Sequence, residues 1–164
     1  MTRSLADCNR VCYNYPEAMR SDGRFALAVH VLAVLAHKEG SCVSSNVLSS
    51  SANMNPVIIR RLLLELQTAR LIETKRGARS GSKLSRAPSE ITLAEVYSAV
   101  RCYEPFGLPK RRPNRRCPVG SCIRETLIEV FSTAREALER ELGRKTLAGL
   151  IQQMQMERPG AGRP

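Results

Sequence analysis

The segment from Asn53 to Gly81, NMNPVIIRRLLLELQTARLIETKRGARSG, constrains the fold of this 164-residue chain more than any other. It reads as an apolar helix that stops at a basic segment containing glycines. Asn55 can cap the helix, and Pro56 suits its first position, where a missing N–H costs nothing. The helical spacing predicts a buried face formed by Ile59, Leu62, Leu63 and Leu66. A helix buried on one side and followed at once by a short hairpin indicates a small, mainly helical domain.

Two helical patterns precede this segment. Apolar residues cover most faces of residues 22–40, so we expect a largely buried helix with His30 packed in the core. Residues 43–53 predict a second, short helix with Ser44 or Ser45 as its N-cap. The residues of this helix that we expect to face inward are Val47 and Leu48. A tight turn then connects it to the third helix.

The chain continues past the third helix with two short strands, predicted in residues 71–85 around a glycine-bearing turn. Thr92 and Glu95 form the sequence pattern of a capping box at the start of the next helix. Prolines exclude regular structure from residues 102–120, and a long amphipathic helix of about 30 Å follows. We expect five parts: a disordered extension (1–19), a winged helix-turn-helix domain (20–101), a cysteine-bearing basic loop (102–120), a dimerisation helix with a C-terminal helix (121–156) and a disordered tail (157–164).

The predicted order of helix, short helix, turn, helix and basic hairpin is that of a winged helix-turn-helix, whose third helix enters the major groove of DNA. From Asn55 to Glu90 there are eight Lys or Arg against three Glu, a local balance of +5. Arg60 and Arg61 fall outside the apolar stripe, so we expect them to point outward, toward base edges and phosphates. The alternative is that this pair is merely solvated. The candidate DNA-binding residues are Ser44, Ser45, Asn53, Asn55, Arg60, Arg61, Lys75, Arg76, Arg79 and Lys83.

The charge of the whole chain indicates the same kind of partner. The net charge is +11 and the pI is about 10.0, which favours a polyanion, with nucleic acid ahead of a membrane surface. No apolar run approaches the roughly 18 residues of a membrane span, and the N-terminus lacks the apolar core of a secretory signal. We therefore expect a cytoplasmic protein that binds double-stranded DNA and no membrane. The sequence shows no enzyme signature such as paired carboxylates or a phosphate-binding glycine loop, so we predict that it is not an enzyme.

Three segments together resemble the Rrf2 family of bacterial winged-helix transcription regulators: MRSDGRFALAVHVLAVLAH, NPVIIRRLLLELQTARLIETKRG and RAPSEITLAEVYSAV. The motif RRCPVGSCI before the long helix is similar to one branch of that family. The resemblance covers roughly residues 19–150, which implies that the first 18 residues are an extension. It also implies a homodimeric repressor whose long C-terminal helix forms the dimer contact. The hairpin departs from the family pattern, because Gly81, Ser82 and Lys83 replace paired glycines and an aromatic residue.

The long helix carries apolar residues every three or four positions, with Glu and Arg between them. From Arg124 to Lys145 five Lys or Arg balance five Glu, so this helix is neutral, unlike the cationic remainder. A neutral amphipathic helix suits a protein partner, and we expect a homodimer; packing on its own domain is the alternative. Two recognition helices would then meet a pseudo-palindromic site about one helical turn apart. The predicted dimer residues are Ile123, Leu127, Phe131, Ala134, Leu138 and Leu142.

Three cysteines flank or lie in the proline-rich loop with the spacing C-x14-C-x4-C: Cys102, Cys117 and Cys122. Cluster-bearing members of the Rrf2 family also place three cysteines between these helices, so an iron–sulfur cluster is one interpretation. Their spacings are tighter, however, and no fourth ligand can be assigned here. Neighbouring cations favour the reactive thiolate form, which suggests a reversible thiol switch instead. Inert cysteines are the third interpretation, and the cations of this loop could also contact phosphates.

Our sequence-based hypothesis is therefore a homodimeric DNA-binding transcriptional repressor that responds to redox state or to another effector, with no cofactor assigned. One alternative is an iron–sulfur-cluster sensor that uses the three loop cysteines. The other is a basic winged-helix module that binds RNA or protein.

Overall fold

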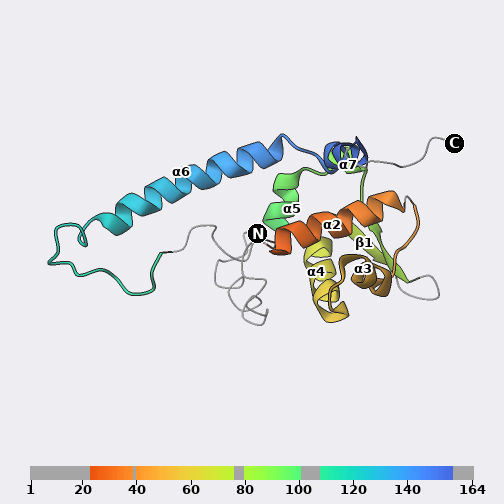
Figure 1. The fold of residues 1–164 in the computed structure, drawn as a ribbon, viewed down its shortest axis with the longest axis horizontal. Helices are drawn as coiled ribbons and strands as arrows, with labels where there is room; N and C mark the ends of the chain where they lie inside the picture. Colours follow the sequence, from red (N-terminus) through yellow and green to blue (C-terminus); the bar gives the residue numbers. More distant parts are fainter. Residues whose placement is uncertain (1–22, 39, 76–79, 101–107, 157–164) are drawn as a thin grey trace.

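The structure is a computed structural model that describes residues 23–38, 40–75, 80–100 and 108–156. Figure 1 shows how its helices and strands are arranged. The helices are α2 (Gly23–His37), α3 (Ser45–Ala52), α4 (Pro56–Thr68), α5 (Leu93–Val100), α6 (Ile123–Gly143) and α7 (Leu147–Met156), and a short 3-10 helix is η3 (Pro88–Glu90). The strands are β1 (Ile72–Lys75) and β2 (Gly81–Leu84). This is the predicted fold: a mainly helical winged helix-turn-helix with a two-stranded wing and a long C-terminal helix.

The hydrophobic core lies where α2, α3, α4 and α5 pack together beside the wing. The residues predicted as the buried face of α4 are Ile59, Leu62, Leu63 and Leu66, and all four are buried. Burying one Leu or Ile side chain contributes about 1.5–3 kcal/mol, so this face determines how α4 lies. The opposite face of α4 is consequently left on the outside of the domain.

α2 is largely buried, as predicted, because its partly buried apolar residues also pack against the core. Its buried apolar residues are Ala28, Val31, Leu32, Leu35 and Ala36. The prediction that His30 packs in the core is wrong, because His30 is exposed and its Nε2 lies 3.1 Å from the Ser51 Oγ of α3. Helical spacing explains the error: His30 is four residues after Ala26 and seven before His37, and both of these are exposed.

α3 begins where the sequence predicts. The Ser44 Oγ accepts a hydrogen bond from the Val47 N–H at 3.4 Å, and Leu48 is buried as expected. The inward orientation predicted for Val47 is wrong, because this residue is 51% exposed. Adjacent residues of a helix point about 100° apart, so this short helix turns only one of the two toward the core. Asn53, with φ of 49° in the left-handed region, ends the helix and begins the turn into α4.

The wing is an antiparallel pair in which Lys75 lies opposite Gly81. Val43, just before α3, joins it by exchanging two backbone hydrogen bonds of 2.9 Å with Ser82. A Cβ at Gly81 would lie 2.8 Å from the carbonyl group of Val43, so this close approach requires glycine. The residues that replace the family's aromatic wing pattern therefore attach the wing to the segment that leads into α3.

α6 extends away from the winged domain. It contacts α5, and Figure 1 shows its first half and residues 108–122 projecting beyond the other helices. Residues 108–122 form turns but no helix or strand, as the prolines predict. α7 returns to the domain, where Leu147 is fully buried and its N–H donates to the Ile91 carbonyl at 2.9 Å. Among the described helices, none is long and apolar enough to cross a membrane.

Candidate nucleic-acid interface

α4 presents one exposed face, beginning at its first turn. The Asn55 Oδ1 accepts a hydrogen bond from the Val57 N–H at 2.8 Å, and Pro56 occupies the first helical position, as predicted. Because the apolar stripe turns inward, the opposite side of the helix and the preceding turn lie in solvent. The exposed residues there include Asn53, Asn55, Val57, Arg60 and Leu64. A recognition helix offers its first residues to the major groove in this way.

The predicted serine contacts lie at the start of α3. Ser44 and Ser45 are both half-buried, and the hydroxyl of Ser44 caps the helix. The hydroxyl of Ser44 therefore has a local structural role as the cap of α3. The turn on the other side of α3 is held by Ser49, whose Oγ donates to the Met54 carbonyl at 2.5 Å. This bond stabilises the turn that connects α3 to α4.

The two adjacent arginines of α4 lie in different surroundings. Arg60 is exposed, whereas Arg61 is half-buried and its charge lies near Glu65, one turn further along the helix. The sequence predicts that both side chains point outward. Arg60 does so fully, whereas Arg61 is partly covered because it lies closer to the buried stripe. Arg60 is therefore the stronger candidate for a contact with a base.

A buried ion pair that sequence reasoning missed joins α2 to α4. The Arg24 Nη2 donates to the Glu65 Oε2, and the two side chains are 4% and 16% exposed. Burial raises the pKa of the Glu65 carboxyl above its ordinary value, and the nearby Arg24 charge offsets this only in part. Glu65 lies on the core side of α4, between Leu62 and Leu66. A Glu between two buried leucines could have been recognised from the sequence as a carboxylate that needs a cation partner. The sequence does not indicate which cation that is.

The cations of the wing are not equally free to bind a phosphate. The Lys83 Nζ lies 3.2 Å from the Glu73 Oε2 across the sheet, and both side chains are partly exposed. Such exposed pairs contribute about 0–1 kcal/mol, so a phosphate can compete for this lysine. Lys75 is exposed and has no ion-pair partner in the described part of the wing. The predicted contacts Arg76 and Arg79 lie outside the described residues.

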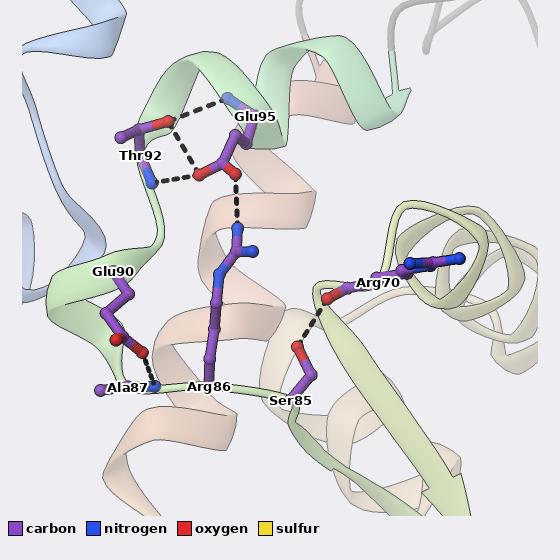
Figure 2. Close-up of polar contacts among 7 residues, drawn as sticks. All are labelled: Arg70, Ser85, Arg86, Ala87, Glu90, Thr92 and Glu95. Atoms are coloured by element: carbon purple, nitrogen blue, oxygen red, sulfur yellow. Dashed lines mark hydrogen bonds and ion pairs between the residues drawn. The ribbon is translucent and has the colours of Figure 1, made fainter.

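A hydrogen-bond network ties the ends of α4 and the wing to α5 (Figure 2). The Ser85 Oγ donates to the Arg70 carbonyl at 2.6 Å, and the Arg86 Nη2 donates to the Glu95 Oε1 at 2.5 Å. The predicted capping box is confirmed, with the Thr92 N–H 2.9 Å from the Glu95 Oε2 and the Glu95 N–H 3.3 Å from the Thr92 Oγ1. Burial raises the pKa of the Glu95 carboxyl, but the hydrogen bonds from Thr92 and Arg86 together lower it by more. The pKa of Glu95 is therefore below its ordinary value.

Residues 22–153 match the sequence profile of Rrf2, which is described as an iron-dependent transcriptional regulator. The chain belongs to the Rrf2 family. It is 35% identical over 130 residues to YwnA of Bacillus subtilis (strain 168), assigned as an HTH-type transcriptional regulator, and the match covers 79% of this chain and 96% of YwnA. These matches confirm the resemblance seen in the three sequence segments. An Rrf2 protein is a transcriptional regulator and not an enzyme.

Two solved structures share the Rrf2 fold of this chain. One, assigned as a DNA binding protein, has a TM-score of 0.63 at 33% identity and covers 78% of this chain and 98% of its own. The other, from Lactobacillus plantarum and assigned as a transcriptional regulator, has a TM-score of 0.70 at 25% identity and covers 82% and 91%.

The long helix of this Rrf2 protein is not covered by the described part of the chain. No residue of α6 is buried in the described structure, although its apolar side runs along its whole length. Five of the predicted dimer residues are half-buried: Ile123, Leu127, Phe131, Ala134 and Leu142. Leu138 is 37% exposed and Val130, which helical spacing places on the same side, is 54% exposed. This side is therefore available to a partner.

Two of the three loop cysteines of the Rrf2 chain are described. Cys117 and Cys122 are exposed, and the Cys122 Sγ lies 3.5 Å from the Pro118 carbonyl at the start of α6. Cys102 lies outside the described residues. Within residues 23–38, 40–75, 80–100 and 108–156, no three His, Cys, Asp or Glu side chains are arranged to hold a metal ion. The described donors therefore do not by themselves form an iron site.

Proposed function

We propose that this Rrf2 protein is a homodimeric transcriptional repressor that inserts α4 into the major groove of its DNA site. The observation that carries the proposal is the exposed face of α4, which begins at the Asn55 cap and bears Arg60 while the opposite face is buried. An arginine there can donate two hydrogen bonds to a guanine edge. Lys75 of the wing is exposed, and in this proposal it contacts a phosphate.

The uncovered apolar side of α6 supports the homodimer. A second copy of α6 would cover the same side chains on both protomers, as a two-fold symmetric interface requires. α6 carries three Arg and five Glu, and Arg144 and Lys145 directly after it balance the charge, so two copies do not strongly repel each other. Two α4 helices would then meet half-sites about 34–36 Å apart. A dimer bound across a promoter excludes the polymerase, which is the repressor activity that we propose.

Selection of binding sequences from a random duplex library by the full chain tests this function. On the selected duplex, Arg60→Ala should weaken binding by about 1–3 kcal/mol, which is roughly 5- to 150-fold. On a mixed-sequence duplex the loss should be much smaller, because only phosphate contacts remain there. Arg140→Ala, which removes an exposed arginine from α6, is the matched control. Equal losses on both duplexes, or a preference for single-stranded RNA, would overturn the proposal.

We further propose that the loop cysteines supply the response to redox state. Cys117 is exposed and directly follows Arg115 and Arg116, so an oxidant in solution can reach its thiol. Treatment with peroxide should change the DNA affinity of the wild type and not that of Cys117→Ser. An unchanged wild-type affinity would contradict the thiol switch.

The alternative is an iron–sulfur-cluster sensor that uses Cys102, Cys117 and Cys122, and the iron-dependent description of the Rrf2 family favours it. Protein purified without oxygen should then be coloured and contain iron and labile sulfide, and its visible absorbance should bleach on chelation. Colourless, iron-free protein would overturn the cluster alternative and leave the thiol switch.

A further inference from the structure

The turn segment before α6, residues 108–122, holds a cluster of positive charge that is not part of the winged domain. Five cations form this loop cluster: Lys110, Arg111, Arg112, Arg115 and Arg116. All five are exposed, and residues 108–122 include no Asp or Glu. None of the five takes part in an ion pair in the described structure. By contrast, Arg24, Lys83 and Arg86 of the winged domain each have a carboxylate partner.

The loop cluster is held in shape and is not a free tail. The Asn114 Oδ1 accepts a hydrogen bond from the Arg116 N–H at 2.9 Å. Gly120 lies against the carbonyl oxygen of Asn114, with which a Cβ at this position would collide. The Arg124 Nη1 in the first turn of α6 donates to the Pro109 carbonyl at 3.3 Å. The segment is thus folded back on the start of α6, and its like charges lie close together with no ion pair to an acid among the described residues.

The position of the loop cluster separates it from α4 of the same chain. α6 has 21 residues, so it spans about 30 Å between the loop and the end that contacts α5. In a dimer whose two α6 helices pair antiparallel, the start of one helix lies beside the end of the other. Each loop cluster is then carried to the winged domain of the partner subunit, where the DNA is bound.

We propose that the loop cluster is a second DNA-contact surface, which binds phosphates flanking the half-site read by α4 of the partner subunit. This inference rests on the proposed homodimeric DNA-binding function. Guanidinium groups suit phosphate because they donate paired hydrogen bonds and remain charged. Contacts of this kind increase affinity and its salt dependence, and they do not choose between base sequences.

The test is the salt dependence of binding to the selected duplex, extended about 10 bp beyond each half-site, roughly one turn of DNA. Arg111→Gln with Arg112→Gln should reduce the slope of log affinity against log salt concentration by about 0.9 for each phosphate that the loop no longer binds. The ratio of affinities for the selected and mixed-sequence duplexes should stay unchanged. Arg144→Gln with Lys145→Gln is the control, because it also removes two cations, which pair with Glu141 at the other end of α6.

A second measurement tests the location of the contact. Shortening the duplex to the two half-sites should weaken binding of the wild type and leave the variant nearly unaffected. Arg115→Gln with Arg116→Gln, checked for unchanged helicity and dimer formation, should behave like the first pair of substitutions. The proposal is overturned if both loop variants keep the wild-type slope, or if their weaker binding persists on the shortened duplex. Failure of the proposed function is distinct, since Arg60→Ala would then leave sequence preference unchanged whatever the loop does.

Discussion

The buried pair of Arg24 and Glu65 leads to a prediction about which partner is harder to remove. An arginine guanidinium stays charged at any pH at which a protein is folded. A carboxyl can instead take up a proton, and burial already raises the pKa of Glu65 above its ordinary value. We therefore expect Glu65→Gln to destabilise the fold more than Arg24→Met does.

The pH limits the cost of Arg24→Met. Without Arg24, Glu65 can avoid a buried charge by protonation, and its ordinary pKa is 4.5. Protonation at pH 7 then costs at most about 3.4 kcal/mol, and at pH 5 at most about 0.7 kcal/mol, at about 1.36 kcal/mol per pH unit. Glu65→Gln leaves a buried guanidinium without this carboxylate, and breaking such a pair costs about 3–5 kcal/mol at either pH.

Urea unfolding, followed by circular dichroism at pH 5 and pH 7, measures both deficits. The protein concentration must be the same throughout, because dimer formation adds to apparent stability. The deficit of Arg24→Met should shrink by about 2–3 kcal/mol at pH 5, whereas that of Glu65→Gln should not change. An Arg24→Met deficit that is equal at both pH values, or larger than that of Glu65→Gln, would refute the reasoning.

The same experiment has a control and an internal check. The double variant Arg24→Met with Glu65→Met should be near wild-type stability, because an apolar pair can replace a buried ion pair without loss.

In the wild type the raised pKa means that the folded state holds the Glu65 proton more tightly than the unfolded state. Its contribution to stability should therefore decrease as the pH rises above 4.5, and level off above the folded-state pKa.

Three further predictions follow from local geometry. Gly81→Ala should lower both stability, by about 1–3 kcal/mol as in overpacked sites, and DNA affinity, measured by denaturation and by duplex titration. Thr92→Ala should cost about 1 kcal/mol at pH 7. The pKa of Glu95 is lowered below its ordinary value of 4.5. The charge of Glu95 therefore contributes its full stabilisation above pH 4.5, and this stabilisation should be lost as the pH falls through the folded-state pKa. Val130→Glu should convert the dimer to a folded monomer in light scattering, whereas Thr133→Glu, on the charged side of α6, should not; a dimeric Val130→Glu protein would contradict the proposed interface.

Much of the candidate site could be predicted because it depends on local signals. The Asn55 cap, the proline at the first position and the four buried residues of α4 follow from rules that act within one or two turns of a helix. The capping box of α5 has the same origin. The exposure of Arg60 follows from the same spacing, since a residue outside the apolar stripe faces solvent.

The sequence does not predict the surroundings of residues whose neighbours come from distant parts of the chain. The sequence predicts His30 in the core, yet it lies on the exposed side of α2, beside Ser51 of α3. Lys83 is paired with Glu73 by the register of the wing, which the sequence pattern does not specify. Arg61 is half-buried, and its charge lies near that of Glu65, which is paired with Arg24 of α2.

The sequence by itself determined which segments form helices, where those helices begin, and which face of α4 is buried, because these properties depend on the spacing of neighbouring residues. Only the tertiary structure decided that Arg24 supports α4 through Glu65, that Val43 holds the wing, and that the segment before α6 projects beyond the other helices. Each of these facts joins residues far apart in the chain. Their energies depend on distance and burial in space, which the order of residues does not state.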